Sequence, residues 1–253
     1  MSERSKLWLL VGITFGVIVA VFALVPPLAQ PQTYHDFADP RGVWGIPNFG
    51  DVMSNTPFFF AGLFGLWVML KRVGLGPWSE DARLPLAVFF TGVFLVAPGS
   101  AYYHLAPDNA TLFWDRLPMT VAFMGLMAAV ITDRVNSDKG VRIVLPALII
   151  FGAGSAIYWH ITDDLRAYLL VQFLPVLIIP LIMLLWPHGK WITWRAILGV
   201  FVFYTLAKLT EHFDAEVLEL MGGAISGHTI KHVFAALGPV AVACTLIKPR
   251  DQS

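Results

Sequence analysis

Eight long runs of mostly apolar residues divide this chain and constrain its fold more than any other feature. A helix needs about 20 residues to cross roughly 30 Å of hydrocarbon. Hydrophobic residues make up 57% of the sequence and charged residues 13%, whereas soluble domains carry roughly 25% charged residues. We therefore predict an all-α integral membrane protein with eight spans and no soluble domain. The runs lie near residues 6–28, 52–70, 84–105, 111–132, 142–160, 167–186, 192–212 and 223–247.

Basic residues between the runs set the expected orientation, because they are retained on the cytoplasmic side. With eight spans, one side collects Arg4, Lys6, Lys71, Arg72, Arg83, Arg134, Lys139, Arg142, Lys190, Arg195, Lys248 and Arg250. The opposite loops hold Arg41 and Arg166 among many acidic residues. Both termini are therefore expected in the cytoplasm. The 17 basic and 17 acidic residues balance, so the composition gives no sign of a nucleic-acid partner.

Five polar residues fall where the bilayer should penalise them. Ser100 and His104 end one run, Asp115 begins the next, and His228 and His232 begin the last. Each i,i+4 pair shares one helix face. The eight-span topology places all five within about two helical turns of the non-cytoplasmic surface. Ionisable groups at such a depth are costly and mark functional sites.

Three imidazoles and a nearby carboxylate are the residues of a catalytic zinc site with one open position. Taken alone, His104 could equally be a metal ligand or a residue that forms an interhelical hydrogen bond. A single His-x-x-x-His pattern is a weak indication of metal binding. Together, His104, His228 and His232 are predicted to bind Zn²⁺. Asp115 is predicted to carry the proton of the attacking water, and Ser100 to assist at the attacked carbonyl.

Other polar residues are expected to support this site. Glu211 and Asp214, at the end of the seventh run, could orient a ligand imidazole. Lys231 is expected to pair with Glu211 or another carboxylate, or to meet an anionic group of the substrate. We expect Arg116 to reach toward the headgroups. Ser54 and its neighbour Asn55 are expected to form interhelical hydrogen bonds.

The arrangement resembles the alkaline ceramidases, whose superfamily includes the adiponectin and progestin receptors. The resemblance rests on Ser100-x-x-x-His104, Asp115 and His228-x-x-x-His232, supported by the stretch Phe49–Asn55. It implies a seven-helix core over residues 52–247, an added N-terminal transmembrane helix over 1–30, and an outer loop over 31–51. It also implies zinc at the three histidines, with Asp115 and Ser100 as catalytic residues.

The substrate implied by the resemblance is ceramide or a similar N-acyl membrane lipid, cleaved to a fatty acid and a long-chain amine. Animal ceramidases also hold calcium before their first core helix. The same segment here offers Asp36, Asp39, Asn48 and Asp51, so a calcium site is a second expectation. The denser acidic cluster of the animal enzymes is not matched.

Other functions remain open from the sequence alone. A receptor-like or ligand-binding protein could use the same helices with a structural zinc closed by four protein ligands. A haem-binding electron carrier is disfavoured because His228 and His232 lie on one helix at one depth. Intramembrane proteolysis is weaker still, since the chain lacks His-Glu-x-x-His and has no glycine two residues before Ser226.

Overall fold

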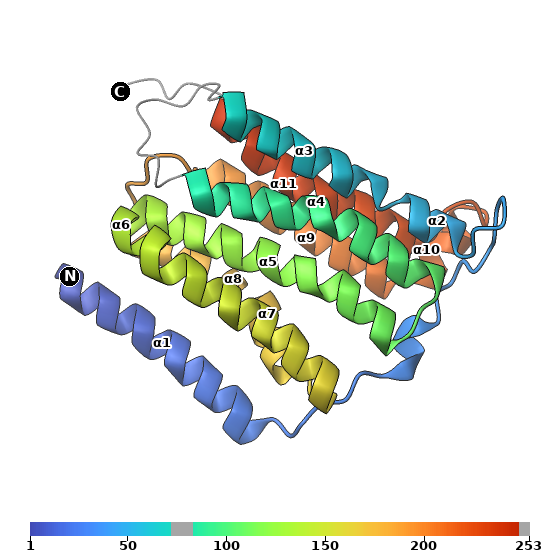
Figure 1. Ribbon diagram of the computed structural model, residues 1–253, viewed down its shortest axis with the longest axis horizontal. Coiled ribbons are helices and arrows are strands. Elements are labelled where there is room, and N and C mark those ends of the chain that lie inside the picture. The colour runs from blue at the N-terminus through green and yellow to red at the C-terminus, as the bar shows by residue number, and fades with distance from the viewer. Residues whose placement is uncertain (72–82, 248–253) are drawn as a thin grey trace.

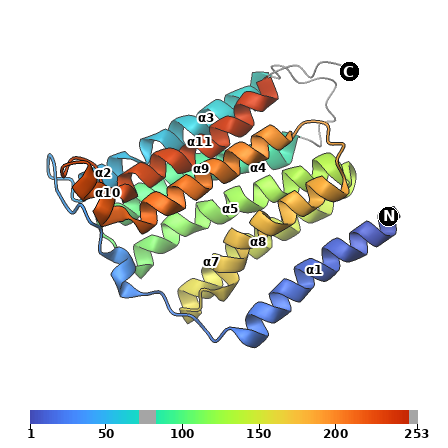
Figure 2. The same ribbon diagram turned by 180° about the vertical axis from the view of Figure 1, so that it is seen from behind.

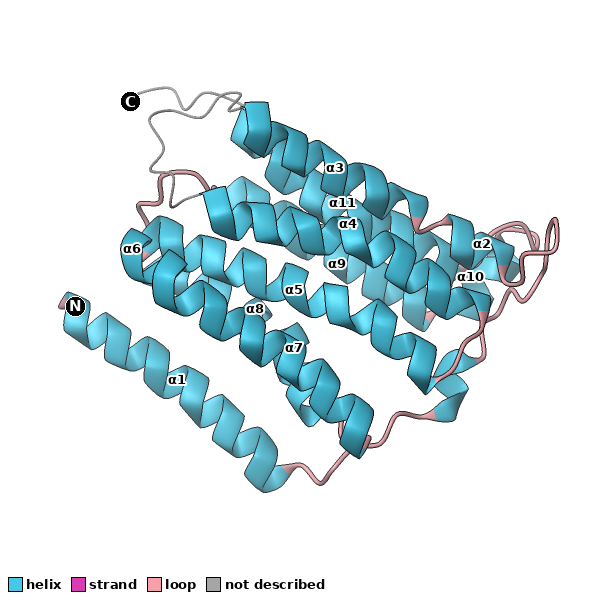
Figure 3. Ribbon diagram, viewed as in Figure 1, coloured by secondary structure: helices cyan, strands magenta, loops and turns pink. Residues whose placement is uncertain are grey.

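The computed structural model describes residues 1–71 and 83–247, and within these ranges the long elements are all helices (Figure 3). Arg72, Lys248 and Arg250, used above for the orientation, lie outside the described residues. The helices are α1 (Glu3–Leu24), α2 (Phe49–Met53), α3 (Thr56–Lys71), α4 (Arg83–Leu105), α5 (Asn109–Arg134), α6 (Ser137–Lys139), α7 (Leu145–Thr162), α8 (Arg166–Leu185), α9 (Trp194–His212), α10 (Asp214–Leu220) and α11 (Gly227–Ile247). The prediction of an all-helical fold is confirmed for this part of the chain.

Seven helical segments among the described residues are long and apolar enough to cross a membrane, as in a multi-pass membrane protein. An eighth is added if α9 and α10 are counted as one span, although they meet at an angle of 84°. The polar residues Lys208 and Glu211 lie in the last turns of α9. They make the α9–α10 pair of helices less apolar than the helices next to it. The prediction of eight spans therefore holds only if the bent pair crosses the membrane. The orientation of the termini stays a prediction.

Three helix ends differ from the expected ranges for local reasons. The first helix ends at Leu24 rather than residue 28, because Pro26 forces the preceding Val25 into an extended conformation. The second expected span begins earlier, with α2, and a break at Ser54 separates it from α3. The last begins at Gly227 rather than 223, because Gly222 and Gly223 take left-handed conformations that a helix cannot use.

The core of the bundle lies around α5. In the apolar stretch of α5, 67% of the residues are buried, whereas no residue is buried in the apolar stretch of α1. Helix α5 packs against α4, α7 and α8, while α11 packs against α9 and α3. Figures 1 and 2 show the N-terminus at one end of the bundle, and α2 and α10 together at the other.

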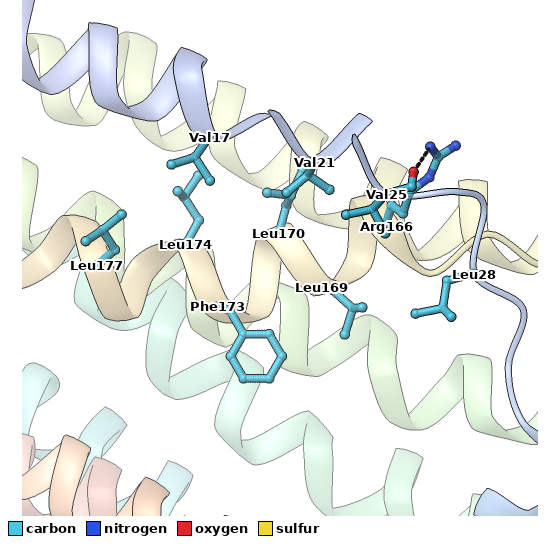
Figure 4. Close-up of a pocket in the computed structure, with 10 residues that line it drawn as sticks. All are labelled: Val17, Val21, Val25, Leu28, Arg166, Leu169, Leu170, Phe173, Leu174 and Leu177. Carbon is cyan, nitrogen blue, oxygen red and sulfur yellow. Dashed lines mark hydrogen bonds between the residues drawn. The ribbon is translucent and has the colours of Figure 1, made fainter. Parts of the chain in front are cut away.

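Helix α1 lies on the outside of the bundle against α8 (Figure 1). An apolar groove of about 300 Å³ between them is lined by Val17, Val21, Leu170, Leu174 and neighbouring residues (Figure 4). Arg166 closes one end by donating a hydrogen bond to the carbonyl oxygen of Val25 at 2.8 Å. This peripheral position fits an added helix, and the boundaries proposed for it at 1–30 stay a prediction.

Two glycines let the helices approach closely where the polar residues lie. A Cβ atom at Gly99 would clash with the carbonyl of Trp114, so α4 and α5 meet next to Ser100 and Asp115. At Gly227, a Cβ atom would clash with the carbonyl of Thr210, so α11 begins against the end of α9. Both contacts bring the polar helix ends to the same end of the bundle.

Candidate metal centre and cavity

The structure brings His104, His228 and His232 together from α4 and α11. One nitrogen of each ring lies within 4.8 Å of the corresponding nitrogens of the other two. The ring centroids are 4.9, 5.0 and 5.1 Å apart, and all three residues are buried. His104 lies 124 positions before His228 in the sequence, so the fold alone creates this cluster.

The ring nitrogens fit a metal ion. His104 Nδ1 and His228 Nε2 are buried and have no hydrogen-bond partner among the described residues. Buried polar atoms in folded proteins are normally paired, so two imidazole nitrogens without hydrogen-bond partners in one cluster suit the coordination of a cation. Neutral imidazole nitrogen is a donor that Zn²⁺ prefers.

His232 is held in a defined tautomer by Ser54. The Ser54 hydroxyl donates to the carbonyl of Asp51 at 3.0 Å, so its oxygen is left to accept from Nδ1–H of His232, 2.7 Å away. A neutral ring that carries its hydrogen on Nδ1 has its lone pair on Nε2. His232 is thereby prepared to coordinate a cation through Nε2. The interhelical hydrogen bond expected for Ser54 is thus confirmed, but the sequence did not show that its partner is a histidine of the cluster.

The segment between α1 and α2 covers the histidines. The Phe37 ring lies 4.7 Å from His104 and 4.5 Å from His228, measured between centroids. Asn48 donates its side-chain amide to the carbonyl oxygen of His104 at 2.8 Å. His35 contacts the Tyr103 hydroxyl at 2.8 Å. These contacts shield the cluster on the side of the loop.

A cavity of about 180 Å³ lies beside the cluster, with His232 in its wall. Ser100 and Asp115 also line it. Most of the remaining lining is apolar, including Phe89, Val93, Val96, Phe123 and Leu126. The cavity thus joins a candidate metal centre and the half-buried carboxylate of Asp115 to a surface suited to an acyl chain.

Glu211 and Asp214 lie near the site but contact other groups than expected. Asp214 accepts a hydrogen bond from the backbone N–H of His228 at 2.6 Å and another from Ala38 at 3.0 Å. It therefore fixes the start of α11 through the main chain. Glu211 accepts from Lys231 at 2.6 Å, which confirms the pairing predicted for that lysine.

Arg116 does not extend to the headgroups, so that expectation is wrong. Its side chain is 6% exposed and donates to Gln30 Oε1 at 2.6 Å. The guanidinium carbon lies 4.2 Å from the Trp159 ring centroid and 4.7 Å from that of Tyr168. Cation–π contacts and one amide oxygen hold this charge inside the protein.

The four residues considered for calcium have separate contacts. Asp36 is exposed, and Asp39 forms a two-pronged ion pair with Arg41 at 2.6 and 2.7 Å. That guanidinium holds the pKa of Asp39 below its usual range. Asp51 accepts from the Thr229 hydroxyl at 2.8 Å, and Asn48 binds the carbonyl of His104. Within the described ranges, the cluster of acidic or histidine side chains close enough to share an ion is the histidine one, and the calcium site stays a prediction.

Comparison with known proteins gives a distant likeness. A segment of 106 residues is 26% identical to a protein of Dictyostelium discoideum named "Putative alkaline ceramidase dcd3A". The match covers 38% of this chain and 37% of the length of that protein. No family model matches the chain.

Proposed function

We propose that this protein is an intramembrane zinc-dependent amide hydrolase that cleaves ceramide or a similar N-acyl lipid. The observation that carries the proposal is a cluster of three buried histidines, one of which, His232, lines a cavity together with Asp115 and Ser100. The name of the Dictyostelium relative supports the same reaction class. Helices of a multi-pass membrane protein surround the cavity, where an acyl chain can enter from the bilayer.

The donor set assigns His104, His228 and His232 to the zinc ion. A bound zinc ion supplies Lewis acidity, which makes a carbonyl more electrophilic and water more acidic. The receptor-like alternative would use the same ion to hold the helices together, with four protein ligands and no open position.

Asp115 is assigned as the proton carrier. In the proposed reaction water adds to the amide carbonyl carbon, the C–N bond breaks, and a carboxylic acid and an amine form. The Asp115 carboxylate accepts the proton from water and delivers it to the departing nitrogen. Ser100, which lines the same cavity as Asp115, donates a hydrogen bond to the carbonyl oxygen as negative charge develops there.

The Asp115→Asn variant separates catalysis from metal binding. An amide cannot accept the water proton, so we expect ceramide turnover to fall by about 10²-fold or more, with the zinc content unchanged. The measurement is product formation by mass spectrometry alongside metal analysis of the purified protein. Asp138→Asn is the matched control, because Asp138 is exposed and pairs with Arg142 far from the cavity.

Equal turnover by Asp115→Asn and the wild type would remove Asp115 from the mechanism. Zinc held by a fourth protein ligand, together with no product from any N-acyl lipid, would favour the receptor-like alternative.

A further inference from the structure

One half-buried and one buried cation line the cavity beside Ser100 and Asp115. Lys231, from α11, has a side chain 15% exposed, and Arg116, from α5, is 6% exposed. Both charged groups line the same cavity as the Asp115 carboxylate. Charged groups at membrane depth are costly, and such residues face ion or substrate sites.

Lys231 is only partly neutralised. Glu211 accepts from Lys231 at 2.6 Å through one oxygen and from Lys208 at 2.6 Å through the other. One carboxylate therefore serves two ammonium groups, and all three side chains line the cavity. This cluster contributes one positive charge in excess.

Arg116 adds a second cation held by neutral groups. Its described contacts are the Gln30 amide oxygen and the faces of Trp159, Tyr168 and Tyr34. No carboxylate forms an ion pair with it among residues 1–71 and 83–247, and its Nη1 has no hydrogen-bond partner there. A neutral side chain could pack among these rings without the cost of burying a charge.

A bound anion would balance the positive charge that remains in the cavity. The carboxylates that line the cavity, Asp115 and Glu211, number one fewer than its three cations, Lys231, Lys208 and Arg116. The apolar lining already suits the acyl half of a lipid, so a negative group on the substrate belongs to the amine half, near the amide.

We propose that the substrate is an N-acyl lipid whose amine half carries a carboxylate or phosphate that Lys231 and Arg116 recognise. This inference rests on the proposed amide hydrolysis and narrows its substrate class. Lys231 and Arg116 then determine specificity for the charged head.

Two substrate pairs test the charge preference on the wild-type protein. N-oleoylglycine and N-oleoylethanolamine share the acyl chain and the amide, and differ in a carboxylate against a hydroxymethyl group. Ceramide 1-phosphate and ceramide form the corresponding phosphate pair. We expect kcat/KM to favour the anionic member of at least one pair by about tenfold or more, because hydrogen bonds to charged groups are worth more than a factor of ten.

Variants test whether the two cations cause the preference. Lys231→Gln and Arg116→Gln should each lower the anionic-to-neutral ratio of kcat/KM about tenfold, while Lys231→Arg should retain it. A merely structural defect would lower both rates and leave their ratio unchanged. Lys190→Gln, at an exposed lysine outside the cavity, is the matched control for charge removal.

The outcomes separate this inference from the proposed function. Hydrolysis with a ratio near one in both pairs, or a ratio that neither glutamine variant lowers, overturns the anionic head and leaves the hydrolase intact. Hydrolysis of no member of either pair overturns the hydrolase and this inference with it.

Discussion

The hydrogen bond from His232 to Ser54 is the contact that most directly prepares the candidate metal centre. It joins two buried residues that lie 178 positions apart in the sequence. By fixing the hydrogen on Nδ1 it directs the lone pair of Nε2 toward the other histidines. The Ser54 oxygen is positioned in turn by the Asp51 carbonyl at the break between α2 and α3. Loss of the hydroxyl should therefore weaken metal binding without removing a ligand.

Ser54→Ala is expected to lower zinc affinity by roughly 10- to 100-fold, as removal of such supporting contacts does. Competition of the purified protein with a zinc-chelating dye measures the change. Ser155→Ala is the matched control, because this buried hydroxyl bonds only the Gly152 carbonyl of its own helix among the described residues. An unchanged affinity in Ser54→Ala would show that the tautomer needs no such support.

Residue types and spacing predicted the histidine cluster and the pairing of Lys231 with Glu211, but not the position of Arg116. The i,i+4 pairs fixed which residues share a helix face, and the count of spans put His104 at the depth of His228. Arg116 was misjudged because its aromatic partners come from distant parts of the chain, Tyr34, Trp159 and Tyr168. Its position depends on tertiary packing, which local pattern does not contain.

At the scale of elements, one carboxylate fastens the segment after α1 to the start of α8. Asp164 accepts from Arg166 at 2.7 Å and from the Tyr158 hydroxyl at 3.1 Å. It also lies 3.4 Å from the backbone nitrogen of Leu28. Its side chain is 4% exposed, and these donors, Arg166 foremost, hold its pKa well below the usual range.

Asp164→Asn should lower the thermal stability of the detergent-solubilised protein at pH 7. Because the folded-state pKa is depressed, the contribution of Asp164 is complete above the unfolded value of about 3.9 and declines as pH falls toward the folded value. The gap in melting temperature between the wild type and the variant should therefore narrow below about pH 4. A difference in melting temperature that widens as the pH falls would show that the carboxylate does not stabilise the fold in its charged form.

Hydropathy predicted where the helices lie more accurately than the residues at which they begin and end. The apolar runs located every long helix of the described residues, because crossing a bilayer demands length and composition. The break at Ser54 and the bend between α9 and α10 escaped this reasoning, since both depend on how polar side chains meet neighbouring helices. The break and the bend both matter to the proposed site, because Ser54 lies at the break and Asp214 directly follows the bend.

At the scale of the whole molecule, the bundle separates the histidine cluster from the N-terminus. The N-terminus lies at the end opposite α2 and α10 (Figure 2), and the histidines lie near α2 and α10. If the basic residues at the N-terminus and in the loops on its side remain in the cytoplasm, the cavity lies near the non-cytoplasmic surface. This is the orientation that the sequence predicts.

Cysteine labelling tests this orientation. In a background where Cys244→Ala removes the native thiol, Glu219→Cys in α10 should react with a membrane-impermeant maleimide on spheroplasts of a bacterial expression host. Lys139→Cys, on the expected cytoplasmic side, should react only after the membrane is opened. Both native residues are exposed in the structure, and the reverse pattern would invert the proposed topology.

The zinc content of purified protein is the most direct test of the central claim that three distant histidines form one metal centre. We expect about one zinc per chain in the wild type and in His188→Ala, a control at an exposed histidine at the other end of the bundle. In His228→Ala, zinc and ceramide hydrolysis should be lost together. Stoichiometric zinc retained in His228→Ala, or none in the wild type purified without chelators, would contradict the account.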